Sequence, residues 1–269
     1  MPEIQTASTA VIKAARRLAR RSERARTGRF LVEGPQAVRE ALGHLEHLLV
    51  TQDAVERERG LVAAAGQSGA RALMVSDRVL SGLAGTVTPQ GMIGIAALAP
   101  SALEAALDAA GVVVVLSQVR DPGNAGTIIR TADAAGAAAV ILTKGSVDPR
   151  NPKAVRASAG SLFHLPVVAD TSFDDVAEGC RQRGIRMIAA APRAGAAAGA
   201  ADLRPPTALV FGSEASGLEA AIIDVCDEVV HVPIYGKAES LNLAAAVAVL
   251  SYEAARQREG ARDPQLVAR

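Results

Sequence analysis

The sequence contains little of what aromatic recognition sites, disulfide frameworks and membrane spans are made of. Only 2% of its 269 residues are aromatic and none is tryptophan, so the core must consist of Ala, Val, Leu and Ile, and extensive stacking on bases is not expected. Two cysteines, Cys180 and Cys226, make neither a disulfide framework nor a metal cluster, and we expect no bound metal. A run of about 18 uncharged apolar residues is missing, which argues against a transmembrane protein.

The composition and the first residues place the chain among reduced globular proteins. Hydrophobic residues make up 49% and charged residues 21% of the sequence, which excludes a disordered or fibrous chain. The length leaves room for one large domain or two small ones. The first five residues lack the charged and then apolar layout of a signal peptide, so we expect a cytoplasmic protein.

The net charge of +1 conceals a basic segment near the amino terminus. The segment from Lys13 to Arg29 contains eight basic residues and one acidic residue, Glu23. Such a segment suits an anionic polymer, and phosphates are the obvious ligands; the alternative is a solvated, partly helical arm. The arginines predicted to contact phosphates are Arg16, Arg17, Arg20, Arg21, Arg24, Arg26 and Arg29.

Strand and helix patterns alternate along the chain, and this alternation is interrupted near residue 99, which indicates a domain boundary. We expect a basic helix or arm over residues 1–28, a small α/β domain over 29–98, a linker over 99–106, a second domain over 107–260 and a tail over 261–269. The all-apolar run Val112–Leu116 indicates a strand covered on both faces, and the alternation after it predicts a doubly wound parallel α/β sheet. Ligands of such sheets bind at the carboxyl ends of strands, which directs attention to the loops after Leu116, Phe211 and Val232.

Polar residues follow the first of these strand ends. Asn124 lies in an Asp-Pro-Gly-Asn turn, where it can cap the next helix, and Arg130 projects from that helix away from its apolar face. The alternative is a capping residue and a surface charge. The Gly-x-Gly-x-x-Gly pattern of dinucleotide-binding loops is not present here.

The second and third loops carry further polar groups. Gly212 and Gly217 flank Glu214, and glycines let a backbone come close to a ligand; the alternative is a plain strand-to-helix turn. In the third loop Ser240 is a natural helix cap and Asn242 falls in the first helical turn. Capping alone would explain Ser240, but asparagine is a poor helix residue unless its amide has a partner.

These three motifs, over residues 121–130, 211–218 and 232–242, resemble the SpoU (TrmH-like) branch of the SPOUT RNA ribose 2′-O-methyltransferases. The leading domain looks like the substrate-binding domain often attached to this family, on the looser match of residues 29–34. The resemblance implies a SPOUT-type fold with a carboxyl-terminal trefoil knot, S-adenosylmethionine bound in the knot, and a homodimer whose interface forms the active site.

The resemblance also assigns roles to residues. It implies a polar catalytic set of Asn124, Arg130, Glu214, Ser240 and Asn242. It implies that S-adenosylmethionine is held at Ala191, Gly212, Val232, Ile234 and Leu241, largely through backbone groups and apolar contact. The basic arginines between Arg16 and Arg29 would then contact RNA.

The substrate implied by the two-domain organisation is ribosomal RNA, and 23S ribosomal RNA in particular. A transfer RNA is the alternative within the same activity. Two other classes are a non-catalytic RNA-binding ribosome-assembly factor, which has no need of the polar catalytic set, and a nucleotide-binding oxidoreductase, for which the glycine pattern is missing.

Overall fold

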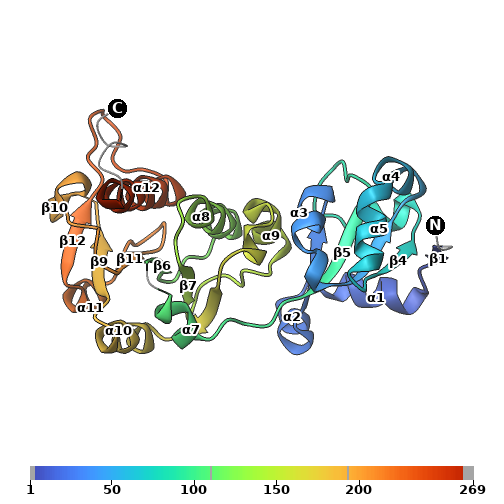
Figure 1. Ribbon diagram of the computed structural model, residues 1–269, viewed down its shortest axis with the longest axis horizontal. Coiled ribbons are helices and arrows are strands. Elements are labelled where there is room, and N and C mark those ends of the chain that lie inside the picture. The colour runs from blue at the N-terminus through green and yellow to red at the C-terminus, as the bar shows by residue number, and fades with distance from the viewer. Residues whose placement is uncertain (1–3, 110, 193, 263–269) are drawn as a thin grey trace. The chain divides into compact units, whose positions relative to one another are not determined.

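The computed structural model describes residues 4–109, 111–192 and 194–262, which form two compact units (Figure 1). The first unit comprises the chain up to Ala99 together with Asp148–His164. The second comprises Pro100–Val147 and the chain from Leu165 onward. The segment 148–164, which the sequence analysis assigned to the second domain, thus makes its contacts mainly with the first unit. Of the expected tail 261–269, residues 263–269 lie outside the described part of the chain.

The first unit is built on a mixed five-stranded sheet with the order β1-β4-β3-β5-β2. The pairs β1–β4 and β3–β4 are parallel, whereas β5 is antiparallel to both β2 and β3. Its strands are β1 (Gln5–Thr6), β2 (Arg29–Glu33), β3 (Leu45–Val50), β4 (Arg71–Met74) and β5 (Met92–Ala97).

Short helices cover this sheet, and the basic segment supplies two of them. The helices are α1 (Thr9–Arg17), α2 (Arg21–Thr27), α3 (Pro35–Glu40), α4 (Gln52–Arg57), α5 (Arg59–Gln67), α6 (Asp77–Ser81) and α9 (Pro152–Ser158), with single 3₁₀ turns at η1 (Leu42–His44) and η2 (Ser161–Phe163). Ala15 and Leu18 are buried in the same apolar cluster as Leu31 and Leu49 of the sheet. The basic segment is therefore part of the folded unit and not a free arm.

The second unit confirms the predicted α/β fold with a parallel sheet. Seven strands pair in the order β10-β12-β9-β11-β6-β7-β8, and every pairing is parallel. The central strands are fully buried Val-, Leu- and Ile-rich runs, as expected for a sheet covered on both faces. The strands are β6 (Val112–Leu116), β7 (Ala139–Thr143), β8 (Val167–Thr171), β9 (Arg186–Ala190), β10 (Ala196–Ala197), β11 (Thr207–Phe211) and β12 (Glu228–His231).

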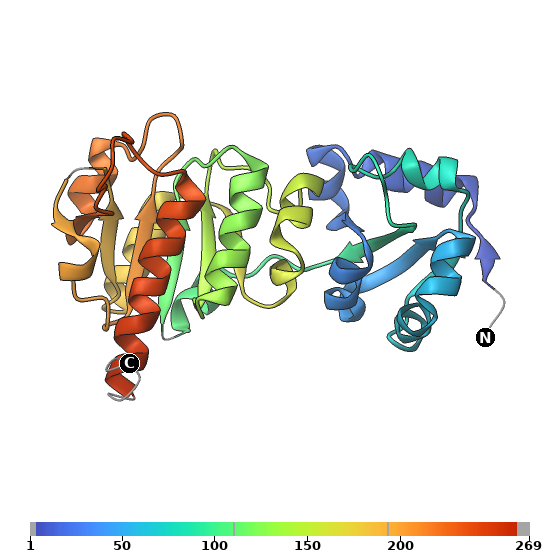
Figure 2. The ribbon, with the colours of Figure 1, turned by 90° about the horizontal axis from the view of Figure 1, so that it is seen from above.

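Helices lie on both faces of this sheet. Figure 1 shows α8 and α12 above it and α7, α10 and α11 below it, and in Figure 2 α12 (red) runs across the strands beside α8 (green). Their bounds are α7 (Leu103–Asp108), α8 (Pro122–Ala134), α10 (Phe173–Gln182), α11 (Ala220–Val225) and α12 (Leu243–Arg262), with a 3₁₀ turn at η3 (Ala198–Ala200).

Two helix starts differ from the sequence prediction. Helix α8 begins at Pro122, and its cap is Asp121, whose Oδ1 accepts the backbone N–H of Asn124 at 2.7 Å. Helix α12 begins at Leu243, and Asn242 rather than Ser240 accepts a first-turn N–H, that of Ala244 at 2.9 Å. The predictions that Asn124 and Ser240 cap these helices were wrong, because a neighbouring side chain accepts the free amide in each case.

Candidate active site

Three loops that are far apart in the sequence meet at the carboxyl edge of the parallel sheet. Asn124, in the first turn of α8, donates from Nδ2 to Oε1 of Glu214 at 2.8 Å. The same residue accepts at Oδ1 from Nδ2 of Asn242 at 3.3 Å. Glu214 follows β11 and Asn242 precedes α12, so Asn124 joins the loop after β6 to both other loops.

The turn around Glu214 depends on its two glycines. Ser213 and Gly217 exchange two backbone hydrogen bonds, at 3.1 and 2.9 Å, which closes a tight turn with Glu214 inside it. Gly217 has φ of +67°, a region that favours glycine. A Cβ at Gly212 would lie 2.1 Å from the carbonyl carbon of Gly217, so no larger residue fits there. Both glycines therefore fix where the carboxylate of Glu214 is presented.

Arg130 and Ser240, the other two members of the predicted catalytic set, are solvent exposed. Arg130 lies on α8, six residues after Asn124, and within the described part of the chain no ion pair or hydrogen bond holds its guanidinium. Ser240 lies just before Asn242 in the third loop. Hydrogen bonds thus bring three of the five residues together, and they leave Arg130 available to a ligand.

The residues predicted to hold the cofactor follow three neighbouring strands. Ala191 comes directly after β9, Gly212 after β11 and Val232 after β12, and these strands are adjacent in the order β12-β9-β11. Ala191 donates its N–H to the carbonyl of Val230 at 3.0 Å, which ties two of these strand ends. Ile234 is half-buried and Leu241 is 39% exposed, so the third loop offers apolar surface beside backbone groups. Backbone groups next to exposed apolar side chains fit a ligand with an adenine ring and polar ends.

One predicted phosphate-contacting arginine is in the wrong place for that role. Arg24 is 2% exposed and its Nε donates to Oδ2 of Asp148 at 2.8 Å, so it cannot reach RNA. The remaining arginines of the set are exposed; Arg17 and Arg26 form surface ion pairs with Glu23, and Arg29 forms one with Glu46.

Gln118, in the loop after β6, makes a further connection between two of these loops that the sequence does not predict. It has φ of +53°, in a region that non-glycine residues rarely adopt, and its Nε2 donates to Oε1 of Glu219 at 2.7 Å. This bond joins the loop after β6 to the start of α11, beside the Glu214 turn. Nothing in the sequence signals it, because glutamine is not a residue that favours positive φ.

The described part of the chain shows neither a metal-binding cluster nor a membrane-spanning helix. Across the ranges 4–109, 111–192 and 194–262, no group of three or more His, Cys, Asp or Glu side chains could hold a metal ion. In the same ranges, no helix combines the length and the apolar character needed to cross a membrane.

Comparison with known proteins identifies the family to which the chain belongs. Residues 111–252 match the model of the SpoU rRNA Methylase family, and residues 10–94 match that of the MRM3-like substrate binding domain. A relative in Bacillus subtilis (strain 168), the 23S rRNA (guanosine(2553)-2′-O)-methyltransferase RlmP, is 34% identical over 255 residues, which cover 94% of this chain and 98% of the relative.

Solved structures agree with this match. An AdoMet-bound rRNA methyltransferase from Sinorhizobium meliloti is 31% identical, with a TM-score of 0.82 over 94% of this chain and 97% of that one. The SpoU methyltransferase AviRb from Streptomyces viridochromogenes, in complex with AdoMet, is 29% identical, with a TM-score of 0.83 over 94% of this chain and 100% of that one. The resemblance drawn from the three motifs is therefore confirmed. The chain belongs to the SpoU rRNA methylase family, whose members are S-adenosylmethionine-dependent RNA 2′-O-methyltransferases.

Proposed function

We propose that this protein methylates a ribose 2′-hydroxyl of 23S ribosomal RNA, with Arg130 as the residue that holds the reacting nucleotide. The observation that carries the proposal is the joining of Glu214 and Asn242 through Asn124, next to an exposed arginine on α8. Ribosomal RNA is favoured as substrate because the relative from Bacillus subtilis, named for 23S rRNA, matches this chain along both units.

Arg130 is the protein residue that binds and orients the reacting nucleotide. Its guanidinium can donate to the 2′-hydroxyl oxygen and to the adjacent phosphate at once, which fixes the oxygen and stabilises negative charge that develops on it. The Asn124, Glu214 and Asn242 network holds the start of α8 in place, so that Arg130 projects from a fixed helix. Ser240 offers one more hydroxyl to the same edge.

S-adenosylmethionine supplies the electrophilic methyl group when it is bound. Ala191, Gly212, Val232, Ile234 and Leu241 would hold it. The protein's own contribution would be orientation: backbone groups at three strand ends are available to hold the cofactor, and the apolar side chains of the third loop would exclude water from it.

Four wider features belong to the same proposal. The exposed arginines of α1 and α2 bind RNA phosphates, which makes binding salt-sensitive. The loops after β11 and β12 form a trefoil knot around the cofactor. The enzyme acts as a homodimer, which is supported by an exposed apolar stripe on α12 that includes Val249 and Tyr252. A ribosomal substrate and two free thiols support a cytoplasmic location.

The test of the proposal is the variant Arg130→Ala. We expect methyl transfer to 23S ribosomal RNA to fall by about 100-fold or more, because one preorganised charge donor is lost. Binding of S-adenosylmethionine, measured by calorimetry, should stay unchanged. Arg181→Ala is the matched control, since Arg181 is an exposed arginine on α10 that pairs with Glu178. Methyl transfer by Arg130→Ala at the wild-type rate would remove the assignment.

The substrate is tested separately. Purified protein and labelled S-adenosylmethionine are incubated with 23S ribosomal RNA, 16S ribosomal RNA and transfer RNA, and 2′-O-methylated positions are mapped. We expect one modified nucleotide in 23S ribosomal RNA. If only transfer RNA were modified, the 2′-O-methyltransferase activity would stand, but the substrate would be transfer RNA and not 23S ribosomal RNA. If none of the three RNAs were methylated, the non-catalytic assembly factor would be favoured.

A further inference from the structure

A polar pocket in the first unit has no part in the function proposed above. It has a volume of about 320 Å³ and is formed by the end of β2, the start of α3, the loop 82–91 and helix α9, all of which belong to that unit. Six polar side chains line it: Glu33, Gln36, Thr86, Thr88, Gln90 and Arg156. Pockets of roughly 300–1,000 Å³ bind small ligands, so this one has room for about one nucleobase with its sugar.

The carboxylate of Glu33 fixes the loop that forms one side of the pocket. Its Oε2 accepts the backbone N–H of Gly85 at 2.9 Å and Nη1 of Arg156 at 3.2 Å. Its Oε1 accepts the N–H of Thr86 at 3.3 Å and the hydroxyl of the same residue. The Glu33 side chain is 9% exposed, and each of its oxygens already has two partners. Glu33 therefore shapes the pocket and has no free acceptor for a ligand.

The guanidinium of Arg156 packs directly on Gly85, where the absence of a side chain leaves space for it. A Cβ at Gly85 would lie 2.2 Å from Nη1 and 2.8 Å from Cζ of Arg156. Because Arg156 is paired with Glu33, the charges that line the pocket cancel, and a phosphate would meet a carboxylate there. A guanidinium plane can instead stack on a nucleobase. The pocket therefore suits a neutral ring better than a phosphate.

Thr88 and Gln90 supply unused hydrogen-bonding groups at the exposed edge of the pocket. Among the residues that the structure describes, none forms a hydrogen bond with the Thr88 hydroxyl or the Gln90 amide. The backbone of Gln90 is fixed, since Arg57 donates from Nη2 to its carbonyl at 2.7 Å. Gly34, with φ of +92°, leaves room for the amide: a Cβ there would lie 3.0 Å from Oε1 of Gln90. An amide carries both a donor and an acceptor, as the edge of a nucleobase requires.

We propose that this pocket binds one unstacked nucleobase of the RNA substrate, with Thr88 and Gln90 hydrogen-bonded to its edge and Arg156 stacked on its face. This inference rests on the proposed function, since it assumes that the protein binds 23S ribosomal RNA. Sequence-specific recognition of RNA mostly uses unpaired bases that leave the stack and enter protein pockets. Only 2% of the chain is aromatic, so a guanidinium takes the place of an aromatic ring as the stacking surface.

The test measures the Kd of the whole chain for 23S ribosomal RNA in Gln90→Ala and in Gly85→Ala. The first variant removes the amide. The second displaces the flexible end of Arg156 and keeps the backbone N–H that binds Glu33. We expect the Kd to rise about 10-fold in each variant, as for the loss of one contact to a base. The slope of RNA affinity against salt should stay as in the wild type, because no phosphate contact is lost.

Two matched controls lie outside the pocket. Gln67 is exposed at the end of α5, and a Cβ at Gly43 would have no atom within 4 Å. We expect Gln67→Ala and Gly43→Ala to leave the Kd for RNA within about twofold of wild type. Urea unfolding of all four variants shows whether the fold is kept.

Chemical probing of the bound RNA reports on the base itself. Dimethyl sulfate and a carbodiimide modify the Watson–Crick edges of unpaired bases. At saturating protein, we expect at least one base of 23S ribosomal RNA to be protected by the wild type and by both controls. The same base should react again in the complexes with Gln90→Ala and Gly85→Ala.

Three results would overturn the inference. An unchanged Kd in both pocket variants would mean that RNA does not enter the pocket. A raised Kd together with a smaller salt slope would mean that the pocket contacts phosphate. A raised Kd with the same bases protected in every complex would assign these residues an indirect, structural effect. If the wild-type protein itself neither binds nor methylates 23S ribosomal RNA, the proposed function fails and the inference fails with it, which the wild-type measurements alone reveal.

Discussion

Asn124 uses both polar atoms of its side chain, and the chemistry of an amide explains why this position requires it. Nδ2 donates to the Glu214 carboxylate, while Oδ1 accepts from Asn242. An aspartate of the same size would face a second carboxylate, and a leucine would leave two partners unpaired. One side chain with a donor and an acceptor on opposite sides is what allows three loops to meet.

The two cysteines illustrate a residue type that packing makes inert. Cys180 is fully buried, and Sγ of Cys226 donates to the carbonyl of Ile222 at 3.2 Å. Burial raises the pKa of both thiols to about 11, so little thiolate is present at pH 8.

We expect native Cys180 and Cys226 to react with iodoacetamide at pH 8 about 100-fold more slowly than the same thiols in urea, because the thiolate is the nucleophile. Mass spectrometry of trapped peptides measures both rates, and the unfolded protein is the control. Since the folded thiols have the raised pKa, their contribution to stability is present below pH 9 and is lost as the pH rises toward 11. Equal labelling of native and unfolded protein would contradict this picture.

At the residue scale, the three motifs correctly predicted that polar residues near the carboxyl ends of the strands lie close together. Glu214 and Asn242 could be paired with Asn124 only because a family resemblance linked the three motifs; spacing alone does not join residues 118 positions apart. Arg24 was predicted to be a phosphate ligand because composition treats all arginines of a basic segment alike. Its burial depends on Asp148, and no sequence pattern places that aspartate beside it.

Elements were predicted best where burial is strongest. The strand β6 has the predicted bounds, because five consecutive apolar residues suit a strand covered on both faces. Helix α4 was not predicted. It has only six residues, QDAVER, and buries only Ala54 and Val55, so it is too short to show a helical periodicity of apolar residues. The starts of α8 and α12 were misplaced because several residues in each loop can cap a helix.

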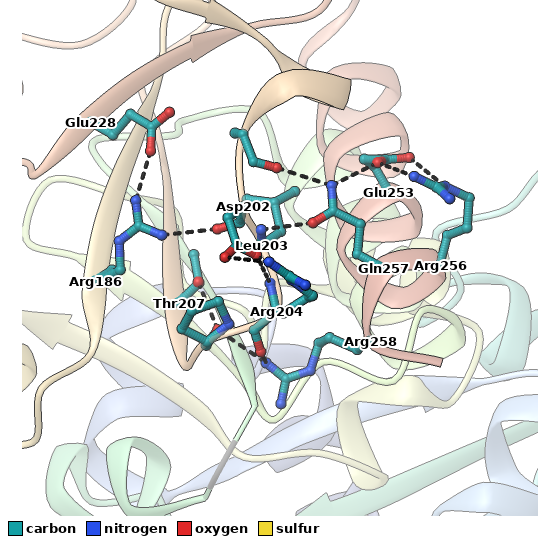
Figure 3. Close-up of polar contacts among 12 residues, drawn as sticks. Arg186, Asp202, Leu203, Arg204, Thr207, Glu228, Glu253, Arg256, Gln257 and Arg258 are labelled. Atoms are coloured by element: carbon teal, nitrogen blue, oxygen red, sulfur yellow. Dashed lines mark hydrogen bonds and ion pairs between the residues drawn. The ribbon is translucent and has the colours of Figure 1, made fainter. Parts of the chain in front are cut away.

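Helix α12 links the candidate active site to the opposite edge of the sheet, where a set of polar contacts fastens its other end (Figure 3). Gln257 donates from Nε2 to the carbonyl of Ala201 at 3.0 Å and accepts at Oε1 from the N–H of Leu203 at 2.8 Å. Arg258 donates to the carbonyls of Arg204 and Pro205 at 3.1 and 3.2 Å. The segment before β11 is therefore held mainly through its backbone.

Removal of this amide tests the importance of that fastening. We expect Gln257→Ala to lower the free energy of unfolding by about 1–3 kcal/mol, because the N–H of the fully buried Leu203 loses its partner. Urea denaturation measures the change. Gln182→Ala is the control, since Gln182 is exposed on α10 and bonds only to Glu178 of the same helix among the described contacts. A loss no larger than that of the control would show that this hydrogen bond adds nothing to stability.

At the scale of the whole molecule, the order of two α/β regions could be predicted, but the course of the chain between them could not. The segment 148–164 lies between β7 and β8 in the sequence, yet it packs with the first unit. Phe163 stacks on Phe30 and His44, with ring centroids 6.0 and 5.4 Å apart, and Arg156 pairs with Glu33. Such long-range contacts join residues more than 100 positions apart, which local patterns do not encode.

The exposed apolar stripe of α12 predicts the assembly state. Val249 is 42% and Tyr252 53% exposed, and they lie three residues apart on one face, with exposed Ala245 one turn earlier. The opposite face is buried at Val247 and Leu250. Covering this stripe with the same helix of a second copy would remove its apolar surface from water, in line with the proposed homodimer.

We therefore expect wild-type protein to elute with light-scattering mass near twice the 27.5 kDa of one chain, and Val249→Glu to shift it toward a single chain. A charge placed at the centre of an apolar interface is desolvated without a partner, so association weakens strongly. Val87→Glu is the matched control, because Val87 is fully exposed in the first unit. If the interface also forms the active site, Val249→Glu loses methyl transfer together with the dimer. A dimer that tolerates glutamate at 249 would mean that α12 faces solvent and that the copies meet elsewhere.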